Sequence, residues 1–160
     1  CVMKSIRRGG VRTGDVVCVV GLGVMGLMHV AAAIDRGAIV VGSDFNAERR
    51  AVAEGLGAIC AEPDDVGAML KRASAGRGAD VVVCGPGAPG PLRDAFALAA
   101  SGGTVVMFTP ASALLSNEAF RCASLAQASH TADPCAHAVN ATAFGLTMAS
   151  AAGSVAPGRW

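Results

Sequence analysis

The sequence predicts an α/β fold in which helices cover both faces of a parallel sheet of five or six strands. Three observations lead to this prediction. Short runs rich in β-branched residues alternate with longer segments of helical periodicity between residues 15 and 108. The runs show little polar alternation, as expected of strands buried on both faces. They follow one another at spacings of roughly 20 residues, which fits strand–helix–strand units and excludes a sandwich of short hairpins.

Composition narrows the class of protein. The 160 residues suffice for one domain with a substantial core, and with 52% hydrophobic and 16% charged residues the chain is globular rather than disordered. A net charge of +1 favours neither a nucleic acid nor a membrane surface as partner. The sequence shows neither an apolar run of roughly 18–20 residues nor the pattern of a signal peptide, so we expect a cytoplasmic protein.

The six cysteines do not suggest a metal site. They stand at positions 1, 18, 60, 84, 122 and 135, without a C-x-x-C pair and without a histidine at metal-ligand spacing. Cys18, Cys60 and Cys84 lie in or beside apolar runs. We expect these three to be small buried hydrophobic residues in a reducing compartment.

The first strand is predicted over residues 15–20. The helix after it has an apolar face with 3- and 4-residue spacing and ends at Arg36-Gly37, a cation followed by a C′ glycine. The second strand is predicted over 39–43, and Asn46 is expected to cap a helix over 47–56.

The remaining elements follow in the same alternation. Asp64 or Asp65 is expected to cap a helix that runs to about residue 74. Beyond residue 110 the only regular pattern is a weakly helical one over 136–146, and 149–160 is expected to be a flexible tail. Strands are expected at 58–60, 80–84 and 104–108, turns at 76–78 and 101–103, a loop at 85–91, and a helix from there to about residue 100.

Residues 21–26 form the pattern G-x-G-x-x-G directly after a buried strand and at the start of a helix. In this context each glycine has a physical task. Gly21 permits the tight turn, Gly23 lets the backbone approach a pyrophosphate, and Gly26 lets the helix pack closely on the strand. The start of the helix offers free N–H groups to the phosphates. The motif predicts a Rossmann-type site for a dinucleotide.

Asp44 ends the second strand, 18 residues after Gly26. A carboxylate there can accept hydrogen bonds from both hydroxyls of an adenosine ribose and would repel the 2′-phosphate of NADP, which favours NAD. Asp44 could instead cap a helix or lie in a solvated turn. Arg49 could hold a 2′-phosphate or stack on the adenine.

Cys84-Gly85 and Phe108 end the fourth and fifth strands, where ligands of parallel sheets bind, although they could equally serve packing. His29 is expected to be a packing or surface residue, and His130 and His137 have no suitable partner in the sequence. No residue is predicted to be catalytic or to ligate a metal.

These residues resemble the coenzyme-binding domain of zinc-dependent medium-chain alcohol and polyol dehydrogenases, and among them sorbitol and threonine dehydrogenases look most similar. The likeness extends over about residues 1–110. It is carried by the run from Gly14 to Gly26 and by residues 42–44, 48–49, 56–58, 77–80 and 101–105.

The resemblance implies a role for each candidate residue. The pyrophosphate would lie on the glycine turn, the adenosine ribose on Asp44, and the adenine beside Arg49. The pyrophosphate would be held by Gly21, Gly23, Val24, Met25 and Gly26, and the nicotinamide end would be lined by Cys84, Gly85 and Phe108.

The family's catalytic domain, which supplies the zinc ligands, has no counterpart in these 160 residues. We therefore expect zinc and the alcohol substrate to bind only where that domain is present, and NAD to bind here without unaided alcohol oxidation. Residues 1–14 are expected to be a connecting helix and lead-in, 15–125 the NAD(P)-binding domain, and 126–160 a divergent, weakly structured tail. Members of the family often form oligomers through the edge strand that follows the fifth strand, so this chain could also form a homo-oligomer.

Residues 122–160 do not resemble the family, and their Ala/Ser/Pro/Arg bias suits a shifted reading frame of GC-rich DNA, a hypothesis that sequencing the gene would test. Two other functions stay open: a stand-alone NAD(H)-sensing module, and a truncated remnant without function. A SAM-binding protein fits less well, and competition between NADH and SAM would distinguish it.

Overall fold

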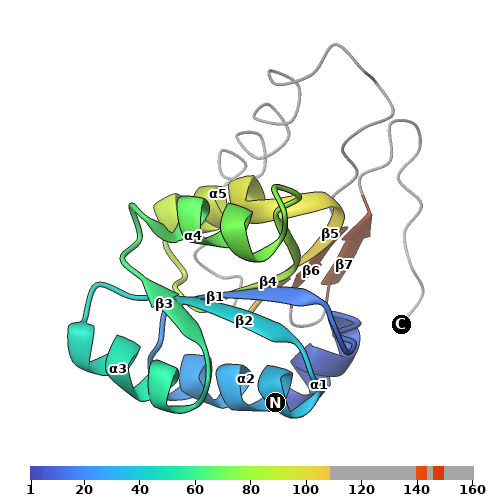
Figure 1. The fold of residues 1–160 in the computed structure, drawn as a ribbon. Helices are drawn as coiled ribbons and strands as arrows, with labels where there is room; N and C mark the ends of the chain where they lie inside the picture. Colours follow the sequence, from blue (N-terminus) through green and yellow to red (C-terminus); the bar gives the residue numbers. More distant parts are fainter. Residues whose placement is uncertain (109–139, 144–145, 150–160) are drawn as a thin grey trace.

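The computed structural model describes residues 1–108, 140–143 and 146–149, and these residues form a three-layer α/β arrangement (Figure 1). A twisted sheet lies between two layers of helices. Helices α1 (Val2–Arg8), α2 (Val24–Asp35) and α3 (Ala47–Gly55) cover one face, and α4 (Val66–Ala73) and α5 (Pro89–Leu98) cover the other. In the part of the chain that the structure describes, no helix is long and apolar enough to cross a membrane.

Among the described residues the sheet has seven strands in the order β3-β2-β1-β4-β5-β6-β7. All neighbouring strands are parallel except β6 and β7, which are antiparallel. The first strand of the sheet is β1. The next two strands, β2 and β3, lie on one side of it, and the chain then returns to place β4 on its other side. This reversal beside β1 is where open parallel sheets bind ligands. The strands are β1 (Val16–Val20), β2 (Ile39–Ser43), β3 (Ile59–Ala61), β4 (Ala79–Cys84), β5 (Ala99–Met107), β6 (Asn140–Ala143) and β7 (Leu146–Ala149).

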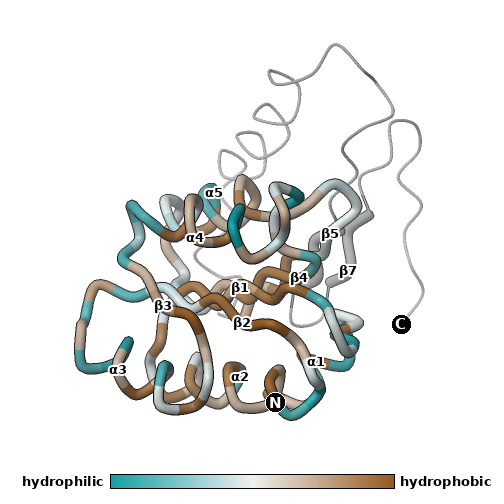
Figure 2. Tube along the Cα trace, viewed as in Figure 1, coloured by the Kyte–Doolittle hydropathy of each residue, from teal (hydrophilic) through white to brown (hydrophobic). Residues whose placement is uncertain are grey.

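Successive residues of the central strands belong to opposite halves of the core, because side chains alternate across a sheet. Val17 and Val19 of β1 pack with α1 and α2, whereas Val16 and Cys18 pack with α4 and α5. All four are at most 2% exposed, so the strand contains no polar face. Figure 2 shows the hydrophobic strands of the sheet between two layers of helices whose residues vary in hydropathy. The α/β class and the parallel sheet predicted from the sequence are confirmed.

Several predicted elements are confirmed in detail. β2 has the predicted bounds, and Asn46 caps α3 by accepting a hydrogen bond from the Arg49 backbone N–H at 3.1 Å. Gly37 has φ of +77°, as a glycine that follows the end of a helix often does. The predicted turn at 76–78 contains Gly76 and Gly78, both with positive φ.

Other boundaries differ from the prediction. Asp65 occupies the N-cap of α4, but its side chain makes no capping hydrogen bond. α5 begins at Pro89, inside the predicted loop, because a proline at the first helical position lacks only an N–H that has no helical partner.

The predicted turn at 101–103 lies within β5. Ala99 pairs with Ala79 and Thr104 pairs with Val81, so β5 carries extra residues in an irregularity between these pairs. Gly102, with φ of +77°, forms part of that irregularity. The turn chemistry was recognised correctly, but the strand was predicted to start too late.

The helix predicted over 136–146 is wrong for residues 140–143, because these residues form β6 and pair in parallel with β5. Hydrogen bonding along the edge of an existing sheet overrides the weak helical preference of a segment rich in Ala and Thr. With β6 the sheet contains the sixth parallel strand that the sequence left open, and β7 adds a strand that was not predicted. Of the tail predicted over 149–160, Ala149 is the last residue of β7, and residues 150–160 lie outside the described residues, as does the boundary at 125.

Candidate functional site

A pocket of about 830 Å³ lies at the carboxyl ends of the central strands. Every candidate binding residue lines it except Cys84. Its walls come from the turns after β1 and β2, the end of β2, the connection between β3 and α4, the first turns of α2, α3 and α4, helix α5, and the residues after β4 and β5. The lining residues are Val20, Gly21, Gly23, Val24, Met25, Gly26, Ser43, Asp44, Phe45, Arg49, Pro63, Val66, Gly85, Pro86, Pro91, Asp94, Leu98 and Phe108.

The glycine turn has the tight geometry that its sequence predicts. Gly21 has φ of +88°, and its N–H donates to the carbonyl oxygen of Ser43 at 2.8 Å. A Cβ on Gly26 would lie 1.9 Å from the carbonyl oxygen of Gly21, which leaves no room for a side chain. A Cβ on Gly23 would meet nothing within 4 Å. Gly26 is therefore required by packing, and Gly23 keeps open space beside the pocket.

Helix α2 begins at the pocket. Gly23 is its N-cap and supplies no side chain to cap the first turn, while Val24 and Met25 line the pocket. The first N–H groups of a helix lack partners within the helix, and they carry the positive end of its dipole. An anion in this pocket would meet those groups.

The Asp44 carboxylate is held in place by the backbone. Its Oδ2 accepts from Leu22 N–H and its Oδ1 accepts from Asn46 N–H, each at 2.8 Å. Arg49 Nη1 lies 3.5 Å from Oδ2. A carboxylate offers about four lone-pair sites, so acceptor capacity remains on both oxygens for further hydrogen-bond donors.

The charge of Asp44 is stabilised. Burial on its own raises the pKa of this carboxyl, but the backbone hydrogen bonds from Asn46 and Leu22, together with Arg49, outweigh burial and lower the pKa below its ordinary value. The group is therefore ionised at neutral pH.

Arg50 and Glu62 belong to the neighbourhood of the site although sequence reasoning did not single them out. Arg50 Nη1 donates to the carbonyl oxygens of Asp44 and Phe45 at 2.8 and 3.0 Å, and Nη2 donates to Glu62 Oε1 at 2.9 Å. Phe45, which lines the pocket, is 83% exposed. Phe45 could have been predicted as a pocket residue because it directly follows Asp44. The contact between Arg50 and Glu62 joins residues 12 positions apart and has no pattern in the local sequence that predicts it.

The opposite end of the pocket is formed after β4 and β5. The N–H of Gly85 donates to Val20 O and that of Phe108 donates to Cys84 O, each at 3.0 Å, so both residues continue the sheet pairing into the pocket wall.

Cys84 is expected from the sequence to line the nicotinamide end, but it is not among the residues that line the pocket. Its side chain points into the core and is 2% exposed, with Sγ 3.5 Å from the carbonyl oxygen of Pro86. Burial, and secondarily Asp94, raise the pKa of its thiol to about 11. The Cys84 side chain faces the half of the core that lies between the sheet and helices α4 and α5.

His29 is a packing residue, one of the two roles expected for it. It is 1% exposed, with Nδ1 2.6 Å from the carbonyl oxygen of Met25 and Nε2 hydrogen-bonded to Ser5 Oγ. Its ring meets the edge of Phe108 at 4.8 Å between centroids. His130 and His137 lie outside the described residues.

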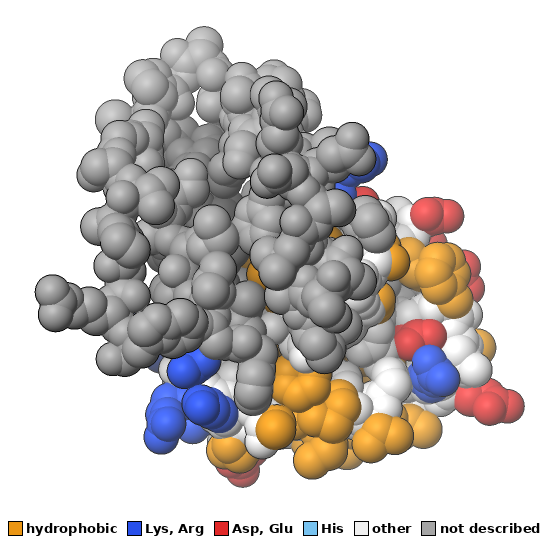
Figure 3. Space-filling view, turned by 180° about the vertical axis from the view of Figure 1, so that it is seen from behind, with side chains coloured by type: hydrophobic (Ala, Val, Ile, Leu, Met, Phe, Trp, Pro, Cys, Tyr) orange, Lys and Arg blue, Asp and Glu red, His pale blue; other side chains and the backbone are white. Residues whose placement is uncertain are grey.

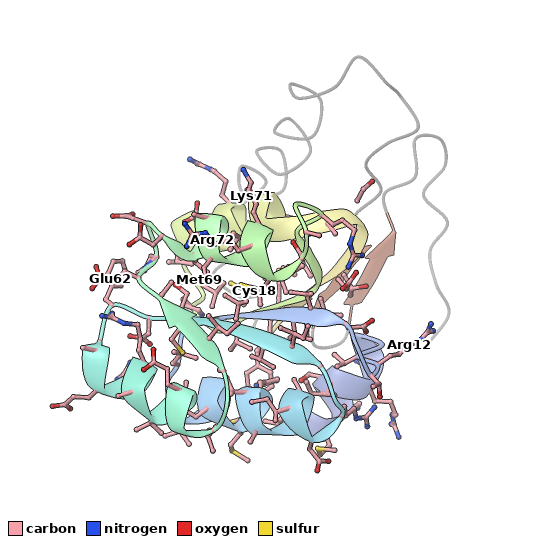
Figure 4. The ribbon with its side chains drawn as sticks, in the orientation of Figure 1. Arg12, Cys18, Glu62, Met69, Lys71 and Arg72 are labelled. Atoms are coloured by element: carbon pink, nitrogen blue, oxygen red, sulfur yellow. The ribbon has the colours of Figure 1, made fainter. Side chains whose placement is uncertain are left out.

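Residues 1–108, 140–143 and 146–149 contain no group of three or more His, Cys, Asp or Glu side chains that could hold a metal ion. The cysteines in this part of the chain are free, and Cys18 is fully buried, which raises the pKa of its thiol to about 12. Cys18 and Cys84 are the small core residues that the sequence predicts, whereas Cys60 is half-buried. Figure 4 shows Cys18 within the sheet.

Comparisons with known proteins agree with this geometry. Residues 24–129 match the family model described as "Zinc-binding dehydrogenase". The chain is 38% identical over 107 residues to D-guloside 3-dehydrogenase of Escherichia coli K12, covering 64% of this chain and 31% of that protein. It is 36% identical over 94 residues to L-threonine 3-dehydrogenase of Bacillus subtilis 168, covering 56% and 27%.

Solved structures show the same likeness. Alcohol dehydrogenase TADH from Thermus sp. ATN1 superposes with a TM-score of 0.64 at 28% identity, covering 69% of this chain and 34% of that one. ECK1772 from Escherichia coli, an oxidoreductase/dehydrogenase of unknown specificity, gives 0.65 at 26% identity, covering 69% and 33%. The matched region spans about a third of the length of the curated relatives.

Proposed function

This chain belongs to the zinc-binding dehydrogenase family, and from that premise we propose that it is the NAD(H)-binding part of an oxidoreductase acting on a secondary alcohol or polyol. The observation that carries the proposal is the Asp44 carboxylate. It is fixed beside the glycine turn by two backbone hydrogen bonds and retains acceptor capacity toward the pocket. That arrangement suits the paired hydroxyls of an adenosine ribose.

The residues of the pocket fit an extended dinucleotide. The open space at Gly23 and the start of α2 suit the pyrophosphate, because the backbone N–H groups there can approach it without a side chain between them. Gly85 and Phe108 would face the nicotinamide end. When bound, the nicotinamide supplies the hydride acceptor or donor, while this chain supplies binding and orientation.

We propose NAD rather than NADP as the preferred dinucleotide. The Asp44 side chain is 9% exposed and its pKa is lowered, so a fixed negative charge stands where a 2′-phosphate would lie. Arg49 is the only described cation that lines the pocket, and it is already 3.5 Å from Asp44. Asp44 should therefore repel the 2′-phosphate of NADP.

Zinc does not fit the described residues of this chain, since they provide no cluster of metal ligands. The substrate class is proposed from the relatives, which are named as 3-dehydrogenases of a guloside and of L-threonine.

Calorimetric titration of the purified chain with NADH and with NADPH tests the proposal. We expect saturable NADH binding, with NADPH at least about tenfold weaker, because a charged hydrogen bond contributes about 1.5–3 kcal/mol. Asp44→Asn removes the charge but keeps one acceptor oxygen, and it should weaken NADH and narrow the gap between the two dinucleotides. A folded sample that binds neither would refute the proposal, and equal affinities would refute the preference for NAD.

A further inference from the structure

Two walls face each other at the end of the pocket that we assign to adenosine. One is the turn from β2 together with the first turn of α3, which presents Asp44, Phe45 and Arg49. The other is the connection from β3 to α4, which presents Pro63 and Val66. Both are loop-like segments at the ends of neighbouring strands, and the width between them sets what can be bound there.

Arg50 connects these two walls. Its Nη1 donates to two consecutive carbonyl oxygens of the first wall, those of Asp44 and Phe45, at 2.8 and 3.0 Å. Its Nη2 donates to Glu62 Oε1 of the second wall at 2.9 Å. The planar guanidinium can do this because its donors are held in a fixed fork, which a lysine lacks.

Both ends of the connection are anchored. The Arg50 side chain is only 18% exposed, whereas the Glu62 side chain is 61% exposed and is held in place through its backbone. The carbonyl oxygen of Glu62 accepts from the N–H groups of Asp65 and Val66, each at 3.0 Å, at the start of α4. Glu62 directly precedes Pro63, and Figure 4 shows it where β3 leads toward α4. A displacement of Glu62 would therefore move Pro63 and Val66 as well.

We propose that Arg50 is a positioning residue for adenosine recognition, which with Glu62 holds the Asp44–Phe45 turn at a set distance from the Pro63 wall. The inference rests on the proposed function and extends it to a residue that does not line the pocket. Arg50 acts through the backbone of Asp44 and Phe45. Without it the turn must be ordered when the ligand binds, and that ordering reduces affinity.

Calorimetric titration with NADH and with ADP-ribose, which lacks the nicotinamide, tests this role. Arg50→Met removes every donor and keeps the apolar stem. We expect it to weaken both ligands by the same factor, about three- to tenfold, since ordering one side chain or turn carries a cost of that size. Phe108→Ala, at the far end of the pocket, should weaken NADH and leave ADP-ribose unchanged.

The controls separate positioning from general damage. Arg72→Met, on the exposed last turn of α4, should leave both affinities at the wild-type value. Glu62→Gln should give a smaller loss, and the double variant with Arg50→Met should bind no more weakly than Arg50→Met alone, because both changes break one contact. If Arg50→Met does not fold, Arg50→Lys replaces it, and the expected equal loss of both ligands stays the same.

The outcomes are distinct. Wild-type binding of NADH with unchanged affinities in Arg50→Met, or a loss confined to NADH, would overturn the role of Arg50 and leave the proposed function intact. Failure of the folded wild-type chain to bind either ligand would overturn the proposed function and this inference with it. An equal loss of both ligands, with the thermal unfolding midpoint at the wild-type value, supports the inference.

Discussion

At the scale of single residues, Asp44 joins local structure to recognition. The same carboxylate that accepts the N–H groups of Leu22 and Asn46 faces the pocket with the rest of its acceptor capacity. Two turns, one after β1 and one after β2, are thereby fixed relative to each other before any ligand is present. The ribose recognition that we propose would therefore need little rearrangement of this carboxylate.

Gly23 and Gly26 form a matched pair for mutation, because they belong to one motif and differ in their surroundings. Gly26→Ala would place Cβ 1.9 Å from the Gly21 carbonyl oxygen. We predict that it lowers the unfolding free energy by about 1–3 kcal/mol and also abolishes NADH binding. Gly23→Ala meets open space, so the unfolding free energy should be kept while NADH binding weakens. Urea unfolding and calorimetry measure the two effects. Equal stability losses in both variants would contradict the packing argument.

His29 makes stability depend on pH. Burial lowers the pKa of its imidazole below 6.5, the contact with the Met25 carbonyl acts in the opposite direction, and the positive charge of the chain's amino end lowers it further. Above pH 6.5 the ring is neutral in both the native and the unfolded state. Below that pH the unfolded chain takes up a proton that the native chain does not, so acid lowers the free energy of unfolding.

We therefore predict that the wild-type chain loses more stability than His29→Gln between pH 7.5 and about 5.5. Urea unfolding at the two pH values gives the comparison, and each protein serves as its own reference at the higher pH. An identical loss in both proteins would show that other groups account for the acid sensitivity.

At the scale of elements, the short helix α1 is held by tertiary packing. Seven residues form too short a helix to be stable alone, but Val2 and Ile6 are buried against the sheet and Ser5 hydrogen-bonds His29 of α2. Figure 3, which views the molecule from behind, shows exposed hydrophobic side chains along the lower edge, beside a group of lysine and arginine side chains. Met3, 55% exposed, is among the exposed hydrophobic residues.

Ile6 and Met3 give a direct measure of this packing. Ile6 is 1% exposed, and Ile6→Ala should lower the unfolding free energy by about 2–5 kcal/mol, because it removes buried methyl groups and leaves a cavity. Met3→Ala in the same helix should change it by no more than about 0.5 kcal/mol. Denaturant titration of both variants makes the comparison. Similar values would mean that α1 does not pack on the sheet in solution.

The elements also show what could be predicted from the sequence. β1 and β2 were recognisable because continuous β-branched runs end at glycine or at capping residues such as Asn46. β6 was not, because its strand character comes from pairing with β5 and not from its own residues. The glycine turn and Asp44 follow from spacing along the chain. The burial of Cys84 and the contact between Arg50 and Glu62 depend on three-dimensional packing that spacing does not encode.

At the scale of the whole molecule, the pocket depends on most of the fold. Its lining comes from residues between Val20 and Phe108, contributed by the ends of several strands and by helices α2, α3, α4 and α5. A ligand that bridges these segments binds the native state and not the unfolded chain. Binding and global stability are therefore linked.

We predict that NADH at a concentration one hundred times its Kd raises the unfolding free energy by about 2.7 kcal/mol. NADPH at the same concentration should raise it less, which provides the internal control. Differential scanning calorimetry over a range of NADH concentrations measures the effect as a rising unfolding midpoint. A midpoint that does not move, in a sample shown by calorimetric titration to bind NADH, would mean that the pocket survives in a partly unfolded state.

The strand order has a consequence for biosynthesis. The end of the pocket that we assign to adenosine is lined by residues up to Val66, whereas Gly85 and Phe108 line the opposite end, and β4, which pairs with β1, follows β3 in the chain. During translation, the ribosome therefore releases the segments that we propose for adenosine recognition before those that we propose to lie beside the nicotinamide. A nascent chain of this protein could hold an adenine nucleotide before it could hold the complete coenzyme.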